Sequence, residues 1–431
     1  MVTDFVLKRR TFVKWAVAFP LLAQVGVQEA FGMGWAKVAR SATDNIYTRL
    51  GVTPVINGRG TWTYISASLE LPEVKAAQEE AARHYVNIFE LQHAVGRRLA
   101  ELTGAESGMI TSGAAGAMAS STAACIAGTD PEKIWQLPDT TGLKSEVVMM
   151  GGRSPFDSAI RLAGGKLVIA KSTAELQNAM NSNTAMIYTT SSPGELAQEI
   201  RVANAHQVPL LMDAAAGIPP IENIRLFSKM GCDLYTFSGG KGLCGPQSSG
   251  LLLGRKDLIE AALANTNPWE GAVCRPMKVG KEEILGCLAA VEAWFKMDLN
   301  ALNREWTSRV ERIAKLVGTV PGATTQIYTP TDENRYPTLA ISWDQKGWGF
   351  STADCAKKLL EGTPSIAVLT DDNPSGVLDR EHRRKNGKDD RRPDKLQIVS
   401  MTLRPGEEII VGKRLRQLLS EARKSAGGVA A

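Results

Sequence analysis

The chain has 431 residues, of which 44% are hydrophobic and 22% are charged, and this ordinary composition excludes disordered and collagen-like proteins. Its 50 basic and 45 acidic side chains leave a net charge of +5, which is too small for this length to indicate nucleic-acid binding. The length predicts two or three domains, one of which can be large.

Residues 1–42 have the pattern of an export signal. The basic motif at residues 8–14 resembles the twin-arginine signal of bacteria, and an apolar run follows at residues 15–23. That run is too short to span a bilayer, so we expect membrane contact only through the signal. Twin-arginine export carries folded proteins, so we predict a periplasmic or exported protein that folds first. The alternative is an amphipathic N-terminal helix on a cytoplasmic protein.

The body of the chain, from residue 43 onward, alternates helical and strand patterns. Residues 72–103 have apolar side chains at helical spacing, and Pro72 suits the first turn of a helix. Short apolar runs bounded by Gly, Ser or Asp predict buried strands at residues 108–111, 147–150, 167–170, 186–190, 209–212, 234–237 and 250–253. Strands interleaved with helices predict an α/β fold with a mostly parallel sheet and helices on both faces.

Proline and glycine punctuate residues 265–280, and a helical pattern resumes at residues 281–294. We therefore predict a large domain at residues 43–275 and a smaller α+β C-terminal domain at residues 276–425. The N-terminal part of the body can contribute to the smaller domain. The charge-dense stretch at residues 371–395 is predicted to be a solvated loop rather than a nucleic-acid patch.

The strongest chemical signal is Lys241, which lies in a glycine-dense turn at residues 238–247 between two predicted strands. Glycine allows the close backbone approach that a turn holding a flat ligand needs. A lysine at a strand end can be directed into a pocket, where its amine acts as a nucleophile or base. Taken alone, the segment fits a glycine turn with a solvated lysine equally well.

Two further segments favour the chemical interpretation. Asp213 ends a predicted strand and precedes three alanines, and a carboxylate is what pyridoxal 5′-phosphate (PLP) needs against its pyridine nitrogen. Another strand leads into small residues that begin a helix, whose free backbone N–H groups suit the phosphate of PLP. These residues are Ser112, Gly113, Ala114 and Ala115. Each segment alone also fits an ordinary strand end or helix cap, but together with Lys241 they predict a PLP site with a Schiff base on that lysine.

Other side chains can complete this site. Ser238 can add a hydroxyl to the phosphate, and Phe156 can stack on the cofactor ring, although an aromatic there also fits a core position. The six cysteines lie far apart without a CxxC pair, and the four histidines do not cluster with them. We therefore interpret the cysteines as small buried residues and predict no metal site.

Several motifs in the chain are similar to those of one enzyme family. They lie at residues 56–61, 102–106, 111–115, 137–140, 213–216, 238–247 and 275–282. On these motifs the chain resembles the fold-type-I PLP enzymes related to selenocysteine synthase, especially the branch that contains D-glucosaminate-6-phosphate ammonia-lyase. The resemblance runs from about residue 46 to about residue 420, and the turn around Lys241 is its most specific part.

The resemblance implies a PLP-binding large domain, a smaller C-terminal domain, and a homodimer or higher homo-oligomer with sites at the interface. It also implies that Arg275 and Lys278 reach a phosphate, and that Arg404 or Arg59 binds a substrate carboxylate. One departure is Gly152, where relatives often carry a histidine. The ring-stacking role would then pass to another side chain, and the reaction type stays open.

We therefore predict a PLP-dependent lyase or transferase that acts at the α-carbon of an amino acid or amino-sugar acid. The leading reaction is α,β-elimination with release of ammonia, in which Lys241 moves the α-proton and Asp213 holds the pyridinium. Racemase, aldolase, aminotransferase and selenium transferase chemistry are the alternatives, although no tRNA-binding domain is evident and no nucleic-acid partner is expected. The alternative without catalysis is an exported ligand-binding protein on a PLP fold.

Overall fold

The computed structural model describes residues 44–331, 333–370 and 395–427. The predicted export signal and nearly all of the predicted loop at residues 371–395 lie outside this described part. Residues 44–54 belong to one compact unit and residues 55–427 to a second. The first unit contains the short helix α2 (Ile46–Arg49), which Asn45 caps with its side-chain oxygen. Among the described residues, no helix is both long and apolar enough to cross a bilayer.

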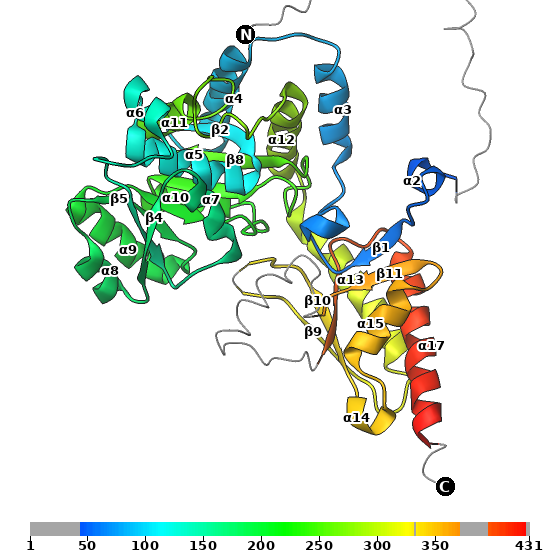
Figure 1. Ribbon diagram of the computed structural model, residues 1–431. Helices are drawn as coiled ribbons and strands as arrows, with labels where there is room; N and C mark the ends of the chain where they lie inside the picture. The colour runs from blue at the N-terminus through cyan, green and yellow to red at the C-terminus, as the bar shows by residue number, and fades with distance from the viewer. Residues whose placement is uncertain (1–43, 332, 371–394, 428–431) are drawn as a thin grey trace, which may run out of the picture. The chain divides into compact units, whose positions relative to one another are not determined.

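A seven-stranded sheet forms the centre of the second unit (Figure 1), in the order β2-β8-β7-β6-β5-β3-β4. Its strands are β2 (Ser107–Ser112), β3 (Glu146–Met150), β4 (Lys166–Ala170), β5 (Thr184–Thr189), β6 (Leu210–Asp213), β7 (Leu234–Ser238) and β8 (Ser249–Gly254). Each corresponds to one of the seven predicted strands. Only β8 runs antiparallel to its neighbours in this sheet, so the prediction of a mostly parallel α/β sheet is confirmed.

Helices cover both faces of this sheet because its strands place apolar side chains alternately on either side. On one face, Met109 and Met149 pack in a core with α5 (Gly113–Ala127) and α11 (Lys256–Ala264). Ile110 follows Met109 in sequence and Val148 precedes Met149, so both point to the other face, where they pack in a separate core. The helices that contribute to this second core include α3 (Pro72–Ala81), α4 (Ile88–Thr103), α9 (Pro193–His206), α10 (Asn223–Met230) and α12 (Lys281–Trp294).

The helical pattern predicted over residues 72–103 is interrupted in the structure. Helix α3 ends at Ala81 and α4 begins at Ile88, after a non-helical link. The reason is local: the side chain of Asn87 accepts hydrogen bonds from the N–H groups of Phe89 and Glu90, at 2.9 and 3.3 Å, and so starts a new helix. The helix predicted at residues 281–294 is present with those bounds as α12.

The C-terminal part of the second unit contains two smaller sheets. Strand β1 (Val55–Gly58) pairs in parallel with β11 (Ser365–Val368), and β9 (Thr324–Tyr328), β10 (Thr338–Ser342) and β12 (Leu396–Val399) form an antiparallel sheet. The helices here are α13 (Leu299–Val317), α14 (Gln345–Trp348), α15 (Thr352–Leu360) and α17 (Glu407–Gly427). These elements share one core with β1, so the first strand of the second unit packs with the last elements of that unit. The predicted division at residue 275 stays a prediction.

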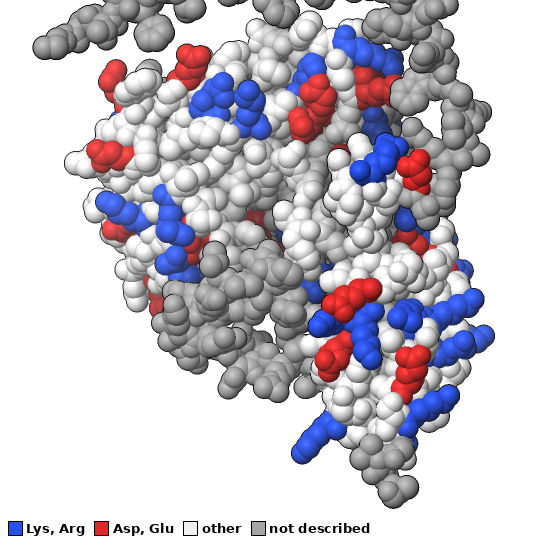
Figure 2. All heavy atoms as spheres, turned by 45° about the vertical axis from the view of Figure 1, so that its right-hand side comes forward, with Lys and Arg blue, Asp and Glu red and all other residues white. Residues whose placement is uncertain are grey.

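The short helices α6 (Pro131–Gln136), α7 (Ser158–Leu162) and α8 (Thr173–Ala179) lie in the connections of the large sheet. Two 3₁₀ turns, η1 (Thr63–Ile65) and η2 (Pro155–Asp157), lie in loops. On the face shown in Figure 2, lysine and arginine side chains lie beside aspartate and glutamate, so the visible described surface carries no continuous basic tract.

Candidate active site

The carboxyl ends of the parallel strands bring three of the predicted cofactor residues to one edge of the sheet. Asp213 ends β6, Ser238 ends β7 and Ser112 ends β2. Strand β8 lies between β2 and β7, and its Ser249 pairs with Ser112 while its Gly250 pairs with Ser238. Ligands of open α/β sheets bind outside the carboxyl ends of strands, so this edge is where a site is expected.

The turn that carries Lys241 is held by backbone contacts that leave no room for larger residues. The N–H groups of Gly239 and Gly245 donate to the carbonyls of Ser249 and Gly239, each at 2.8 Å. A Cβ atom at Gly242 would come within 1.8 Å of the carbonyl oxygen of Ile218. The glycines therefore allow the turn to pack against two neighbouring segments, which fixes the backbone position of Lys241.

The N-terminus of α5 forms the second part of the site. Gly113, Ala114 and Ala115 form its first turn, whose backbone N–H groups have no partner within the helix. Gly250 lies directly against this turn, because a Cβ atom there would come within 2.2 Å of the carbonyl carbon of Gly113. Gly113 itself has a φ of +70°, which glycine adopts without strain. The result is a small, glycine-walled cradle of N–H groups suited to a phosphate.

Asp213 is buried, with 7% of its surface exposed, and its two carboxylate oxygens accept hydrogen bonds from neutral donors. The hydroxyl of Tyr188 in β5 donates to Oδ2 at 2.7 Å, and the N–H of Ala215 donates to Oδ1 at 3.0 Å. Within residues 44–331, 333–370 and 395–427, no lysine, arginine or histidine forms an ion pair with this carboxylate. A buried carboxylate is normally paired with a cation, and the pyridinium of PLP is a cation of the right kind.

Two loops, one before the large sheet in sequence and one after it, contact the segments at this edge. The backbone N–H and the hydroxyl of Ser68 both donate to the carbonyl of Gly240, at 3.1 and 2.8 Å, directly beside Lys241. The N–H of Asn334 donates to the carbonyl of Ala216 at 3.0 Å. These contacts tie the site to segments that lie outside the large sheet in sequence.

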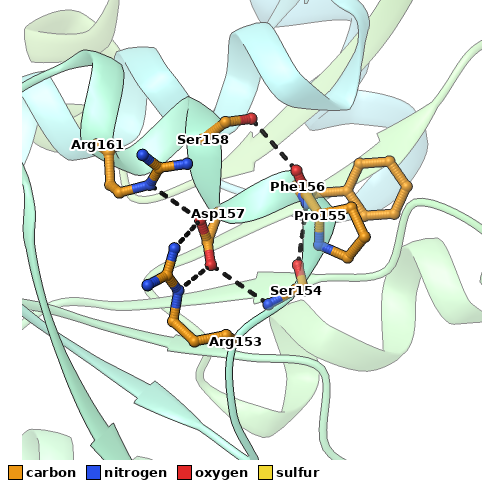
Figure 3. A network of polar contacts seen from close by, with 7 residues as sticks. All are labelled: Arg153, Ser154, Pro155, Phe156, Asp157, Ser158 and Arg161. Atoms are coloured by element: carbon orange, nitrogen blue, oxygen red, sulfur yellow. Dashed lines mark hydrogen bonds and ion pairs between the residues drawn. The ribbon is translucent and has the colours of Figure 1, made fainter. Parts of the chain in front are cut away.

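Phe156, the predicted ring-stacking residue, lies in η2 after β3, and 61% of its surface is exposed. Figure 3 shows that its ring points away from the carboxylate of Asp157, toward which Arg153 and Arg161 both point. Burial acts to raise the pKa of Asp157, but the hydrogen bonds from the two arginines outweigh it and hold the pKa below its ordinary value. This network fixes the loop, and the stacking role of Phe156 stays a prediction.

The two arginines predicted to bind a substrate carboxylate have protein partners. Arg59 is 4% exposed and donates to the carbonyls of Val368 and Thr370, at 2.9 and 3.1 Å, so it joins β1 to the end of β11. Arg404 donates to the carboxylate of Glu407 at the start of α17, at 2.7 Å, while 67% of its side chain remains exposed. Arg404 is thus the more accessible of the two candidates.

Arg275 and Lys278, predicted from the resemblance to reach a phosphate, lie in the loop between α11 and α12, half-buried and exposed respectively. Cys244 follows Lys241 closely, but burial raises the pKa of its thiol to about 12, so it stays a neutral thiol rather than a competing nucleophile. Among the described residues, no group of three or more His, Cys, Asp or Glu side chains is arranged to hold a metal ion.

Two residues at the site were missed at the level of sequence. Tyr188 lies in an apolar run that predicts only a buried strand. Because a buried tyrosine hydroxyl usually needs a hydrogen-bond partner, this residue could have suggested a polar group on a neighbouring strand. Ser68 lies in a loop far from Lys241 in sequence, and nothing in its local pattern points to the turn it contacts.

Comparison with known proteins shows which families the chain is similar to. Residues 173–346 match the aminotransferase class-V family. The chain is 30% identical to a 5′-C-glycyluridine monooxygenase-decarboxylase from a Streptomyces species, over 74% of this chain and 83% of that protein. An L-seryl-tRNA(Sec) selenium transferase from Moorella thermoacetica is 24% identical over 65% of this chain and 66% of that protein.

The D-glucosaminate-6-phosphate ammonia lyase of Salmonella typhimurium is 29% identical, over 88% of this chain and 99% of that protein. A solved structure of D-glucosaminate-6-phosphate ammonia-lyase superposes with a TM-score of 0.73 at 27% identity, covering 88% of this chain and all of that one. The chain therefore belongs to the class-V aminotransferase family of fold-type-I PLP-dependent enzymes, in the branch that contains D-glucosaminate-6-phosphate ammonia-lyase.

Proposed function

We propose that this protein binds PLP on Lys241 and uses it to eliminate ammonia from an amino acid or amino-sugar acid. The observation that carries the proposal is Asp213, a buried carboxylate to which only neutral groups donate among the described residues. It lies at the edge of the sheet where the turn of Lys241 also lies. When bound, PLP supplies an electron sink for the negative charge that develops at the α-carbon of the substrate.

The residues of this chain have separate roles in the proposal. Lys241 would hold the cofactor covalently, and its free amine would take the proton from the α-carbon of the substrate. Asp213 would be the partner of the pyridine nitrogen. The first turn of α5, from Gly113 to Ala115, binds the phosphate with its N–H groups, and the Ser238 hydroxyl adds to them. Arg404 is the candidate for the substrate carboxylate because most of its side chain is accessible.

The relatives support the reaction class to different degrees. The ammonia lyase among them supports elimination, and this is our leading assignment. The relative named as a monooxygenase-decarboxylase favours a second candidate, in which an amino-acid-like substrate loses carbon dioxide and is oxidised by molecular oxygen. Oxygen uptake and carbon dioxide release distinguish this reaction from elimination, which consumes no oxygen. Racemase, aldolase and aminotransferase activity stay as alternatives, because all begin with bond cleavage at the same α-carbon.

The decisive test is the visible spectrum of the purified full-length protein before and after borohydride reduction. We expect a yellow absorption band that reduction traps on Lys241 and that Lys241→Ala removes, while Lys229→Ala, at the exposed end of α10, keeps it. Released ammonia is then measured against a panel of amino acids and amino-sugar acids. A protein that stays colourless after addition of PLP would contradict the proposal and favour the ligand-binding alternative.

We also propose that the protein self-associates. Aromatic side chains are exposed near the start of α4 and in the loop between α11 and α12. Trp269 in that loop is 50% exposed and contacts Phe89 of α4 at 4.8 Å between ring centroids, beside Asn267 and Pro268. Exposed apolar surface of this kind is common at subunit contacts. One chain has a mass of 46.4 kDa, and sedimentation of the purified protein should give at least twice this mass. A monomer at micromolar concentration would refute self-association.

A further inference from the structure

Tyr188 is the feature of the site that the proposed function does not yet use. Its hydroxyl donates to Oδ2 of Asp213 at 2.7 Å, across the neighbouring strands β5 and β6. Tyr188 is 3% exposed and Asp213 is 7% exposed, so water does not replace this contact easily. With Ala215 bonded to Oδ1, both oxygens of the carboxylate are fixed before any ligand is present.

The hydroxyl of Tyr188 is a permanent donor. Burial in the first place, and the neighbouring charge of Asp213 in the second, raise the pKa of Tyr188 far above its ordinary value, so the hydroxyl keeps its proton at neutral pH. Its hydrogen bond fixes the plane of the carboxylate, since each oxygen has its own donor.

The charges around this pair do not supply the same support. Glu333, from the loop before β10, and Asp157, from η2, both add negative charge near the hydroxyl and raise its pKa further. Arg153 and Arg161 are bonded to Asp157 rather than to Asp213. Among the described residues, neutral donors alone therefore hold the carboxylate.

We propose that Tyr188 is a positioning residue that holds the Asp213 carboxylate in its orientation in the cofactor-free protein, so that the partner of the pyridine nitrogen is in place before PLP binds. This inference rests on the proposed function, because it assigns Asp213 to the cofactor ring. It extends that function by naming a group that never touches the cofactor but acts through one that does. Because the carboxylate is already held in place, less conformational entropy is lost when the cofactor binds.

The test measures the dissociation constant of PLP from the full-length, cofactor-stripped protein for wild type, Tyr188→Phe and Tyr235→Phe. Tyr235 is the matched control, because it is fully buried in β7 of the same sheet and its hydroxyl has no contact with Asp213. We expect Tyr188→Phe to weaken PLP binding about 10-fold at neutral pH, the effect of losing one hydrogen bond to a charged group, and Tyr235→Phe to stay within about twofold.

The visible spectrum of the loaded protein separates positioning from simple packing. A carboxylate that has lost its orientation holds the pyridine nitrogen less well, so the absorption band of the bound cofactor should move in Tyr188→Phe and stay in place in Tyr235→Phe. An unchanged band together with unchanged affinity in Tyr188→Phe would overturn the inference.

A second, nearly isosteric replacement guards against a folding defect in Tyr188→Phe. A 3-fluorotyrosine at position 188 keeps both the ring and the hydroxyl donor, so PLP affinity should stay within about twofold of wild type; a loss as large as that of Tyr188→Phe would refute the inference. If the wild-type protein itself binds no PLP, the proposed function fails. If wild type binds and Tyr188→Phe binds as tightly with the same spectrum, only the role of Tyr188 fails.

Discussion

Replacing Asp157 by asparagine keeps the shape of the side chain and removes its charge. The carboxylate of Asp157 is 2% exposed and accepts bonds from Arg161 Nε at 3.0 Å, Arg153 Nη2 at 3.1 Å and the N–H of Ser154 at 3.3 Å. Asparagine offers one acceptor oxygen to these donors, and its amide hydrogens would face guanidinium groups. The variant Asp157→Asn should therefore lose the network shown in Figure 3.

The size of the effect follows from the exposure of the partners. Breaking a fully buried ion pair costs about 3–5 kcal/mol, but more than half of each arginine side chain is exposed here, at 59% and 53%, so each pair is screened. Taking about 1 kcal/mol for each arginine and about 1 kcal/mol for the Ser154 turn gives roughly 2–3 kcal/mol. Thermal unfolding should then begin several degrees lower, and amide hydrogen exchange should rise in the loop between β3 and α7.

The pH dependence provides the sharper check. Because the pKa of Asp157 is lowered in the folded state, its contribution to stability is present above the unfolded carboxyl pKa and is lost as pH falls through the folded one. The difference in unfolding temperature between wild type and Asp157→Asn should persist from pH 7 down to about pH 5 and shrink below about pH 4. Asp257→Asn, which breaks an exposed pair with Arg255, is the control and should change little. An unchanged unfolding temperature, or a difference that does not shrink at all as the pH falls below about 4, would refute the reasoning.

Three further outcomes are expected. Gly250→Ala should weaken PLP binding at least 10-fold and destabilise the protein by about 1–3 kcal/mol, because its Cβ would meet the backbone of Gly113 at 2.2 Å. Gly194→Ala, with open space around it, is the control and should be neutral. Equal behaviour of the two variants would contradict the proposed phosphate cradle. Arg404→Ala should raise KM for the substrate about 10-fold or more with a smaller change in kcat, and an unaltered KM would remove this residue from the substrate site. Arg9→Lys with Arg10→Lys should retain the protein inside a bacterial cell that exports the wild type, as measured by fractionation, and continued export would contradict a twin-arginine signal.

Much of the fold could be predicted from the sequence because its strands are short, apolar and bounded by turn residues. This pattern can be recognised without knowing which elements contact one another. The break between α3 and α4 was missed, since Asn87 acts through two local hydrogen bonds that a periodicity of apolar residues does not register. The C-terminal sheets were predicted only as an α+β segment, because β1 pairs with a strand near the other end of the chain.

Site residues could be predicted where their residue type and neighbours in sequence indicate their role. Lys241 stands among glycines and Asp213 ends an apolar strand, so both could be identified by residue type and position. Arg59 could not be assigned in the same way, because its partners Val368 and Thr370 are backbone carbonyls of a distant segment. Tyr188 was hidden for a similar reason: the acceptor of its hydroxyl lies on the neighbouring strand, and only the register of the sheet brings the two together.

The pairing of β1 with β11 has a consequence for the order of events during synthesis. Arg59 bonds to a carbonyl 309 positions further along the chain, so this bond cannot form until Val368 has been made. The same segment continues to Ser68, which holds the carbonyl next to Lys241. A chain truncated before β11 therefore lacks the strand that anchors this segment, so the end of the chain contributes to the support of the turn around Lys241.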